Sequence, residues 1–347
     1  MLKIGLETES YHLLFQHKKM DIFSFIEKAH EYGLDGVQIN VIKDYNLDEN
    51  WGALGGNSIE HLQKVKDLTT KYGMYTEIDM RGLEYDRVEE VLKVASFIGA
   101  DIIRTYIPIV LSEKQKSEII GSQGGFDFAK IACDFDTSCY DEAIEKINKL
   151  VPLLKKYRIK LALENHEYET STELVNVITA INSPWVGLHY DFGNSMMVWE
   201  EPTIAAKNMA PYTFTTHFKD HIIIEDKNEK YGYVVCGIPA GEGNIDLEEC
   251  FNILMDNSSL TRINIEMCYP YCAQFKRSPG CGGVTDVGKG AFKVEKAPYN
   301  TEEIRPLQYY YPHEVSEKYL ELMMKDQIAG IEKNINYLKK LRENYYR

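Results

Sequence analysis

Short apolar runs typical of buried β-strands alternate along the chain with amphipathic patterns typical of α-helices. The expected strands cover residues 2–7, 35–41, 75–79, 101–107, 159–164, 185–191, 213–219 and 261–266. Helical patterns follow them at about 21–31, 58–72, 86–97, 140–157, 172–182, 202–209, 246–256 and 313–342. In the segment 86–97, for example, apolar residues recur at the i, i+3, i+4, i+7 spacing of one helix face, at Val88, Val91, Leu92 and Ala95.

Eight strand–helix units in strict alternation predict the α/β class, because such units join parallel strands by right-handed crossovers. Eight parallel strands also close a (β/α)₈ TIM barrel with a packed interior. The alternative is an open, doubly wound sheet, which usually carries a glycine-rich phosphate-binding turn after an early strand. Residues Glu7–Ser10, which follow the first expected strand, lack such a turn. The pattern therefore favours the barrel.

Two connections are longer than simple loops. Residues 108–139 follow the fourth expected strand, and residues 267–312 follow the eighth. We therefore expect a single TIM-barrel domain over residues 1–347, with these two segments as insertions on the face where barrel active sites form. Loops of this length in a compact domain are more often lids or partner-binding surfaces than surface decoration, which is the alternative.

Composition and charge restrict the kind of partner and the cellular location that we expect for the protein. The 39 Lys and Arg residues against 53 Asp and Glu residues give a net charge of −14, which argues against nucleic acid, since phosphate backbones are held mainly by Lys and Arg. No segment approaches the roughly 20 apolar residues that span a membrane. The seven cysteines are scattered, and the first residues, MLKIGLETES, show no secretory pattern. Reduced thiols and a cytoplasmic location are expected.

Ionisable side chains close four successive strands of the predicted barrel. Glu164 ends the fifth strand, Asp191 the sixth, His217 lies near the end of the seventh, and Glu266 ends the eighth. Buried charges at such positions are costly unless they are paired or bind a metal. Three carboxylates and one imidazole suit Mn²⁺, Mg²⁺ or Co²⁺ better than a structural zinc. We expect a divalent metal, with Mn²⁺ the leading choice, and a salt-bridged cluster is the alternative.

Other polar residues near the strand ends are candidates for substrate binding or proton transfer. Lys219 lies two residues past His217, where it could hold a substrate oxygen or stabilise an enolate; a salt bridge with Asp220 or with a residue of another strand is the alternative. His166 lies two residues past Glu164 and could act as an acid or base, or make only a supporting hydrogen bond. The ends of the first four strands add the weaker candidates Glu7, Asn40, Asp79 and Arg104.

Five short motifs carry a resemblance to a known superfamily. They are LALENH (161–166), HYDFGN (189–194), HFKD (217–220), GEGNID (241–246) and NIEM (264–267). With the eight-unit pattern, they make the chain similar to the xylose isomerase-like barrel superfamily, and within it to the sugar phosphate isomerase/epimerase branch. The resemblance implies one divalent metal held by Glu164, Asp191, His217 and Glu266. It also implies that Glu164 and Glu266 remove and return the substrate proton.

The chain departs from this branch at one position. Epimerases of the branch commonly carry Asp-x-x-His on the sixth strand, where the histidine helps to hold the substrate. The corresponding residue here is Asn194, an amide that donates a hydrogen bond but does not titrate near neutral pH. We expect Asn194 to contact the substrate in an arrangement that differs from the usual ketose pose.

The residues and the resemblance favour an isomerase or epimerase that forms an enediolate on a small-molecule carbohydrate. The alternative is a lyase that uses the same enolisation for β-elimination on 3-oxo-glycosides, as the large subunits of C-glycoside deglycosidases do with a small partner subunit. A homo-oligomer or such a hetero-oligomer is compatible with both. A remote alternative is an endonuclease IV-like phosphodiesterase, which needs several metals and more than the nine histidines present. A non-catalytic binding barrel is a further alternative.

Overall fold

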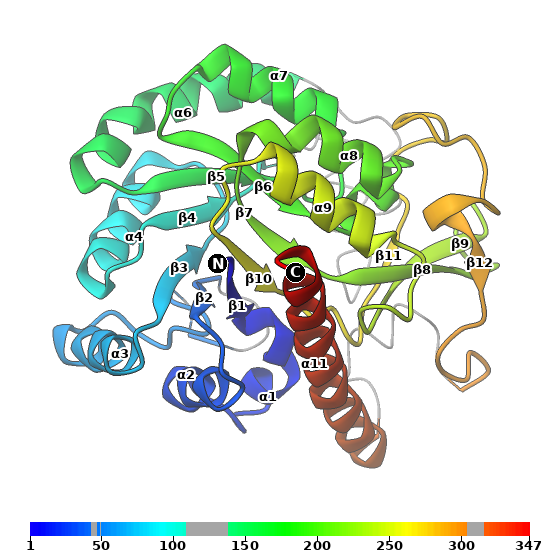
Figure 1. Cartoon of the computed structure of the whole chain (residues 1–347), viewed down its shortest axis with the longest axis horizontal. Helices are drawn as coiled ribbons and strands as arrows, with labels where there is room; N and C mark the ends of the chain where they lie inside the picture. Colours follow the sequence, from blue (N-terminus) through cyan, green and yellow to red (C-terminus); the bar gives the residue numbers. More distant parts are fainter. Residues whose placement is uncertain (43–46, 49, 109–137, 304–315) are drawn as a thin grey trace, which may run out of the picture.

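Eight parallel strands close into a barrel in the computed structural model of the protein, which describes residues 1–42, 47–48, 50–108, 138–303 and 316–347. The barrel strands are β1 (Lys3–Glu7), β2 (Gly36–Asn40), β3 (Tyr75–Asp79), β4 (Ile102–Thr105), β5 (Lys160–Glu164), β6 (Val186–Asp191), β7 (Thr213–Phe218) and β10 (Arg262–Ile265). They pair in this order, and β10 pairs back to β1 (Figure 1). This is the predicted (β/α)₈ TIM barrel.

Helices surround the barrel (Figure 1) and follow its strands as the hydrophobic pattern predicted. They are α1 (His12–Gln16), α2 (Ile22–Glu31), α3 (Ile59–Lys71), α4 (Tyr85–Ile98), α6 (Ser138–Tyr157), α7 (Ser171–Ile181), α8 (Pro202–Met209), α9 (Leu247–Asn257) and α11 (Glu317–Tyr345). The short helix α1 was not predicted. The described residues also form 3₁₀ turns, which are η1 (Thr8–Tyr11), η4 (Asn194–Val198), η5 (Ala210–Tyr212) and η6 (Gly290–Phe292).

Local signals explain where several helices begin and end. Asp21 caps α2 through the backbone N–H of Ser24, and the Ser24 hydroxyl accepts from Asp21 N in return. Thr170 and Glu173 form the same kind of capping box at α7. Helix α4 ends at Gly99, whose φ of 86° lies in the left-handed region that glycine adopts without strain. These local caps fix the ends of the helices.

The two ends of the chain lie together beside β1. Leu2 N donates to Tyr346 Oη at 3.0 Å, and Arg342 donates to the Leu2 carbonyl at 3.0 Å. Figure 1 shows the N- and C-terminal labels close to one another at the end of α11. Helix α11 thereby covers the point where the first and last barrel strands meet.

A second, four-stranded sheet stands beside the barrel, and the sequence analysis missed it. It contains β8 (Asp220–Glu225), β9 (Tyr233–Ile238), β11 (Cys272–Gln274) and β12 (Val294–Glu295), in the order β11-β9-β8-β12. The β8–β9 hairpin interrupts the seventh strand–helix unit, and β8 begins two residues after β7 ends. The apolar runs Ile222–Ile224 and Val234–Val235 were not predicted as strands, because the expected pattern was a strict alternation of strands and helices.

The two predicted insertions have different outcomes. The first, 108–139, falls almost entirely on residues 109–137, which lie outside the described residues. The second, 267–312, is described as far as residue 303 and supplies β11, η6 and β12. The described part of this insertion therefore folds as half of the small sheet, against the hairpin that follows β7.

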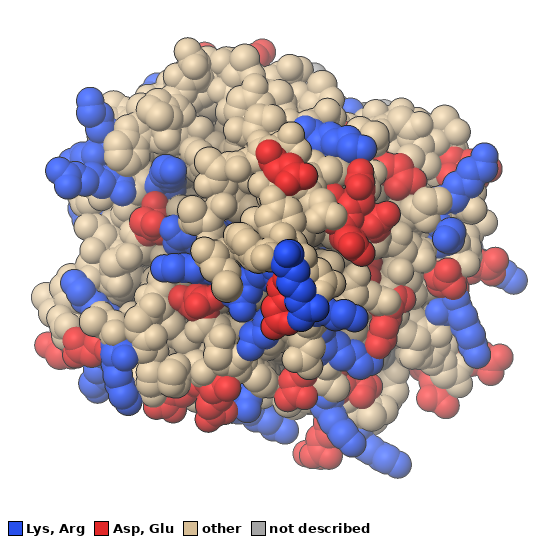
Figure 2. All heavy atoms as spheres, viewed as in Figure 1, with Lys and Arg blue, Asp and Glu red and all other residues tan. Residues whose placement is uncertain are grey.

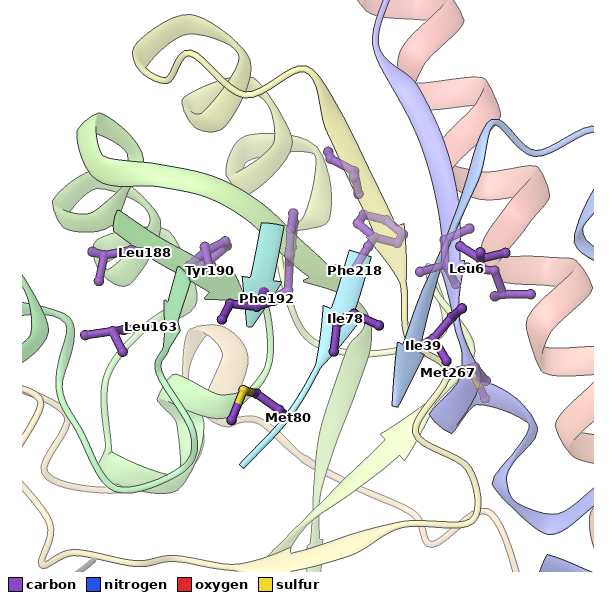
Figure 3. Close-up of a cluster of buried hydrophobic side chains, with 14 of the residues drawn as sticks. Leu6, Ile39, Ile78, Met80, Leu163, Leu188, Tyr190, Phe192, Phe218 and Met267 are labelled. Carbon is purple, nitrogen blue, oxygen red and sulfur yellow. The ribbon is translucent and has the colours of Figure 1, made fainter. Parts of the chain in front are cut away.

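Alternate residues of the barrel strands face two different layers. One layer is a continuous apolar cluster, which includes Leu6, Ile39, Ile78, Leu163 and Phe218 (Figure 3). The residues next to them along the strands are largely polar and meet inside the barrel. Gln38 of β2 contacts His217 of β7, for example, although these strands are not neighbours. The barrel interior is therefore a polar space, enclosed by a hydrophobic shell.

The outer surface carries charges of both signs. Lys and Arg side chains lie among Asp and Glu side chains over the face drawn in Figure 2. This face presents no single basic surface, in keeping with the acidic composition. A search of the described residues finds no helix with the length and apolar character needed to cross a bilayer.

A buried histidine joins the small sheet to the barrel. The ring of His221, in β8, stacks on Tyr271 with centroids 5.7 Å apart, and the side chain is fully buried. A Cβ atom at Gly193 would lie 2.2 Å from His221 Nδ1, so only glycine allows this contact. Burial, followed by the charge of Lys219, lowers the pKa of His221 to about 4.

We expect His221 to make the protein less stable in acid. The unfolded side chain has a pKa of about 6.5, so the unfolded state takes up the proton first as the pH falls. The stabilisation is complete above pH 6.5 and is lost progressively down to pH about 4, by roughly 3 kcal/mol. His221→Gln should flatten the fall in unfolding free energy between pH 7 and pH 4, measured with urea. An unchanged slope would contradict this account.

Candidate active site

The four residues predicted as metal ligands meet at the carboxyl ends of β5, β6, β7 and β10. His217 Nδ1 lies 3.2 Å from Glu164 Oε1, 3.3 Å from Glu266 Oε2 and 3.6 Å from Asp191 Oδ2. All four side chains are buried. The barrel thus brings three carboxylates to one imidazole nitrogen from four adjacent strands.

Backbone contacts hold Asp191 in place. Its Oδ1 accepts from the N–H groups of Gly193 at 2.8 Å and Asn194 at 3.0 Å. Asn165, which follows β5, receives the Asp191 N–H at 2.7 Å and donates to the Asp191 carbonyl at 3.0 Å. The Asx turn after β6 therefore fixes one carboxylate oxygen and leaves Oδ2 directed at the cluster.

Lys219 supplies positive charge to the cluster. Its Nζ lies 2.7 Å from Asp191 Oδ2 and also pairs with Glu266. Burial alone would raise the pKa of Asp191, but Lys219 and the His217 ring bring it below its usual range. For Glu266, burial is likewise outweighed by His217 and Lys219, which lower its pKa to about 2. Both carboxylates are ionised at neutral pH. The ion pair that the sequence left open for Lys219 is formed with these two residues, and Asp220 instead accepts backbone N–H groups, including that of Gly241 at 2.9 Å.

Arg104 connects the cluster to the opposite side of the mouth. Its guanidinium pairs with Glu164 and with Asp79, and the side chain is only 4% exposed. Asn40 donates to the other oxygen of Asp79 at 3.2 Å. Three of the weaker candidates therefore form one chain of contacts that reaches Glu164.

Glu7 differs from the other carboxylates of the mouth. Thr8 donates to its Oε1 at 3.0 Å, and the backbone N–H of Glu9 donates to its Oε2. Burial raises the pKa of Glu7 well above its usual value, and the nearby charges of Asp79 and Glu266 act in the same direction. Glu7 therefore adds to the mouth a carboxyl group that holds a proton more tightly than an exposed glutamate would.

His166 and Asn194 lie beside Glu164 in different surroundings. The His166 ring stacks on Tyr106 with centroids 4.0 Å apart, and burial lowers its pKa to about 3. It is therefore a neutral imidazole at physiological pH. Asn194 is buried, and its Nδ2 lies 3.5 Å from Glu164 Oε1. Its amide thus faces the cluster.

The sequence analysis did not single out His189 as a ligand. Its ring is fully buried, lies edge-on to His217 with centroids 4.1 Å apart, and has no hydrogen bond to either nitrogen among the described residues. Burial lowers its pKa well below the usual value, so the ring is neutral. His189 precedes Asp191 by two residues, and this period-two spacing was the available signal.

These residues have the chemistry of a divalent-metal site. Two overlapping groups, Glu164–His189–His217 and Asp191–His217–Glu266, each place one donor atom per residue within 4.8 Å of the others. Both ring nitrogens of His189 are buried without a hydrogen-bond partner among the described residues, and a metal ion bound to one of them would supply a partner. Carboxylate oxygens with imidazole suit Mn²⁺, Mg²⁺ or Zn²⁺. The donor set therefore fits such an ion.

The insertion after β10 contributes the outer wall of the site. Cys268 Sγ lies 3.4 Å from Glu266 Oε2. Tyr271 donates to Glu167, which pairs with Lys276 Nζ at 3.1 Å. Residues from 267–303 thus join residues that follow β5, as expected for an insertion on the active-site face.

Comparison with known proteins agrees with this geometry. The family described as a xylose isomerase-like TIM barrel matches residues 26–279. A 3-oxo-isoapionate decarboxylase of Pectobacterium atrosepticum is 22% identical over 272 residues, which cover 78% of this chain and 88% of that protein.

Solved structures show the same fold at low identity. A D-psicose 3-epimerase of Clostridium cellulolyticum with D-tagatose has a TM-score of 0.55 and 13% identity, over 96% of this chain and 98% of its own. A xylose isomerase-like TIM barrel protein of Mycobacterium smegmatis in complex with magnesium has a TM-score of 0.55 and 18% identity, over 76% of this chain and 89% of its own. The chain belongs to the xylose isomerase-like TIM barrel family.

Proposed function

We propose that the protein is a divalent-metal-dependent isomerase or epimerase that removes a proton beside the carbonyl of a small carbohydrate. The observation that carries the proposal is the placement of Glu164 and Glu266. Both contact His217 Nδ1, yet they come from β5 and β10, which β6 and β7 separate in the barrel. Carboxylates that approach one point from two directions can take a proton from one face of a substrate and return it to the other.

Glu164, Asp191, His217 and Glu266 would hold the metal, and His189 is a further available donor. A bound divalent ion polarises a carbonyl oxygen and stabilises the enediolate formed beside it. Glu266 is ionised at neutral pH, because its pKa lies at about 2, so it can accept a proton. The neutral His166 is an alternative acceptor.

The remaining residues of the mouth bind and orient the substrate in this proposal. Arg104 and Lys219 are buried cations that can donate to a carbonyl or enolate oxygen. Asn194, Asp79 and Glu7 offer an amide and two carboxyl groups to substrate hydroxyls. A ring of donors and acceptors of this kind suits a polyhydroxylated molecule.

A lyase acting on a 3-oxo-sugar derivative is the second candidate, and the position of Lys219 is compatible with both candidates. An ammonium group held against Asp191 and Glu266 stabilises an enolate whichever bond to the adjacent carbon breaks. The similarity to a 3-oxo-isoapionate decarboxylase supports the same class of substrate. Elimination from a 3-oxo-glycoside, alone or with a small partner subunit, belongs to this candidate.

Metal binding should depend on the residues of the cluster. Dialysed protein should take up one equivalent of Mn²⁺, measured by calorimetry, and chelation should abolish activity while leaving the far-ultraviolet circular dichroism unchanged. Asp191→Ala and His217→Ala should each weaken binding at least about 10-fold. Asp256→Ala, an exposed change on α9, should bind Mn²⁺ like the wild type. A metal-free preparation with full activity would refute the proposal.

Proton transfer should depend on Glu164 and Glu266. Glu→Gln keeps the size and one ligand oxygen but removes the base, so each variant should lose at least about 10²-fold in kcat. His166→Ala tests the alternative acceptor, and Glu248→Gln, exposed on α9, is the matched control. Near-normal rates in all three site variants would contradict the assignment.

Solvent exchange separates the two candidates. The epimerase reaction in D₂O should place deuterium at the carbon beside the carbonyl of a ketose, as mass spectrometry and proton NMR can show. A lyase should leave free ketoses unlabelled and release a product from a 3-oxo-glycoside or a 3-oxo sugar acid. Product release without ketose labelling would replace the first candidate with the second, and neither result would remove both.

A further inference from the structure

A line of polar contacts leads from the metal-ligand cluster into the barrel interior. His217 Nε2 contacts Gln38 Oε1, and Gln38 Nε2 donates to Glu77 Oε2 at 2.9 Å. We propose that Gln38 and Glu77 are positioning residues, which fix the proton of His217 on Nε2 and so present Nδ1 to the metal. The inference rests on the proposed metal site and adds two residues to it that neither the motifs nor the comparisons identify.

The contacts cross the barrel and do not follow neighbouring strands. Gln38 lies on β2, Glu77 on β3 and His217 on β7, and β7 pairs with β6 and β10 only. All three side chains are fully buried. Gln38 and Glu77 occupy inward-facing positions two residues before Asn40 and Asp79, and His217 pairs in register with Asp191.

Hydrogen-bond chemistry determines the direction of each contact. Glu77 Oε2 accepts from Gln38 Nε2, Thr215 Oγ1 at 2.8 Å and Asn264 Nδ2 at 2.8 Å. The amide nitrogen of Gln38 faces Glu77, and its carbonyl oxygen faces His217. A carbonyl oxygen only accepts, so His217 Nε2 must donate to it. His217 Nδ1 then keeps its lone pair, and this is the nitrogen that faces the three carboxylates.

Surrounding contacts support this orientation of Gln38. Tyr75 Oη donates to Asn264 Oδ1 at 2.8 Å, which directs the Asn264 amino group towards Glu77. Arg262 Nε lies 3.4 Å from Glu77 Oε1, and its guanidinium also binds Asp101 at 2.8 and 2.6 Å. A cation and an amide donor thus face Glu77 and favour an accepting oxygen towards Gln38.

If Gln38 and Glu77 only stabilised the fold, the direction of their hydrogen bonds would not affect metal affinity. Residues that accept the second N–H of a ligating histidine orient its ring and raise its basicity, and their loss typically costs about 10- to 100-fold in metal affinity. The positioning role therefore predicts an effect on metal binding that is separate from any effect on folding.

The first test measures Mn²⁺ affinity of the full-length protein by calorimetry. Gln38→Met keeps the length of the side chain but accepts no strong hydrogen bond, and it should weaken binding about 10- to 100-fold. Gln327→Met is the matched control: Gln327 is also fully buried and donates to the Tyr269 carbonyl at 2.5 Å. This control should lower the melting temperature and leave Mn²⁺ affinity unchanged.

The second test exchanges the two polar groups. In Gln38→Glu/Glu77→Gln, the carboxylate at position 38 accepts from His217 Nε2, and the amide at position 77 donates to that carboxylate. The number of negative charges is the same, so affinity should return to within about 3-fold of the wild type, well inside the loss expected for Gln38→Met. Failure of the exchange to restore binding in a folded protein would overturn the positioning role.

A third measurement needs no substitution at Gln38 or Glu77. With saturating Mg²⁺, which is diamagnetic, ¹⁵N-histidine NMR of the wild type should show His217 protonated at Nε2, its signals being assigned by their loss in His217→Ala. Protonation at Nδ1 would overturn the inference. If the wild type binds no divalent metal, the proposed function fails and the inference with it. If it binds Mn²⁺ and Gln38→Met binds it equally well, the inference alone fails.

Discussion

The convergence of three buried carboxylates on His217 Nδ1 is the constraint on which the rest of the site depends. Like charges taken out of water repel strongly, and each carries a desolvation cost that only cations and hydrogen-bond donors can offset. Lys219 and Arg104 supply the cations, and the N–H groups of Gly193 and Asn194 supply donors. The same arrangement holds donor atoms ready for a divalent ion. The charges of this cluster therefore affect stability and, in the proposed function, also metal binding.

Closure of the barrel determines how the surrounding residues are used. Strands that are distant in the sequence face one interior, so polar residues of β2, β3, β7 and β10 meet there and bind one another. Apolar residues at the alternate positions pack outward against the helices (Figure 3). The hydrophobic shell stabilises the fold. The interior can therefore hold a polar network directly beneath the candidate metal site.

The small sheet adds residues that do not belong to the eight barrel strands. Its β8–β9 hairpin and the described part of the insertion after β10 bring His221, Cys268 and Tyr271 around the cluster. Enolisation beside a carbonyl is chemistry that the barrel ends alone can support, whereas the fate of the enolate depends on the groups that contact the remaining substrate. In the proposed function, these added residues and Asn194 are the groups that would contact the remaining substrate.

The eight strands, the principal helices and the four clustered residues were all predictable from the sequence, because buried parallel strands read as short apolar runs and each charged residue ended one of them. Glu164, Asp191, His217 and Glu266 needed only the rule that strand ends meet in a barrel. The hairpin at β8 and β9 was not predicted, because its apolar runs break the alternation. The ion pairs of Lys219 and Arg104, the raised pKa of Glu7 and the contact of Gln38 with His217 depended on tertiary structure. Gln38 and His217 lie on strands that are not neighbours. Lys219 and Arg104 pair with residues of neighbouring strands that are distant in the sequence, and local sequence contains no measure of those distances.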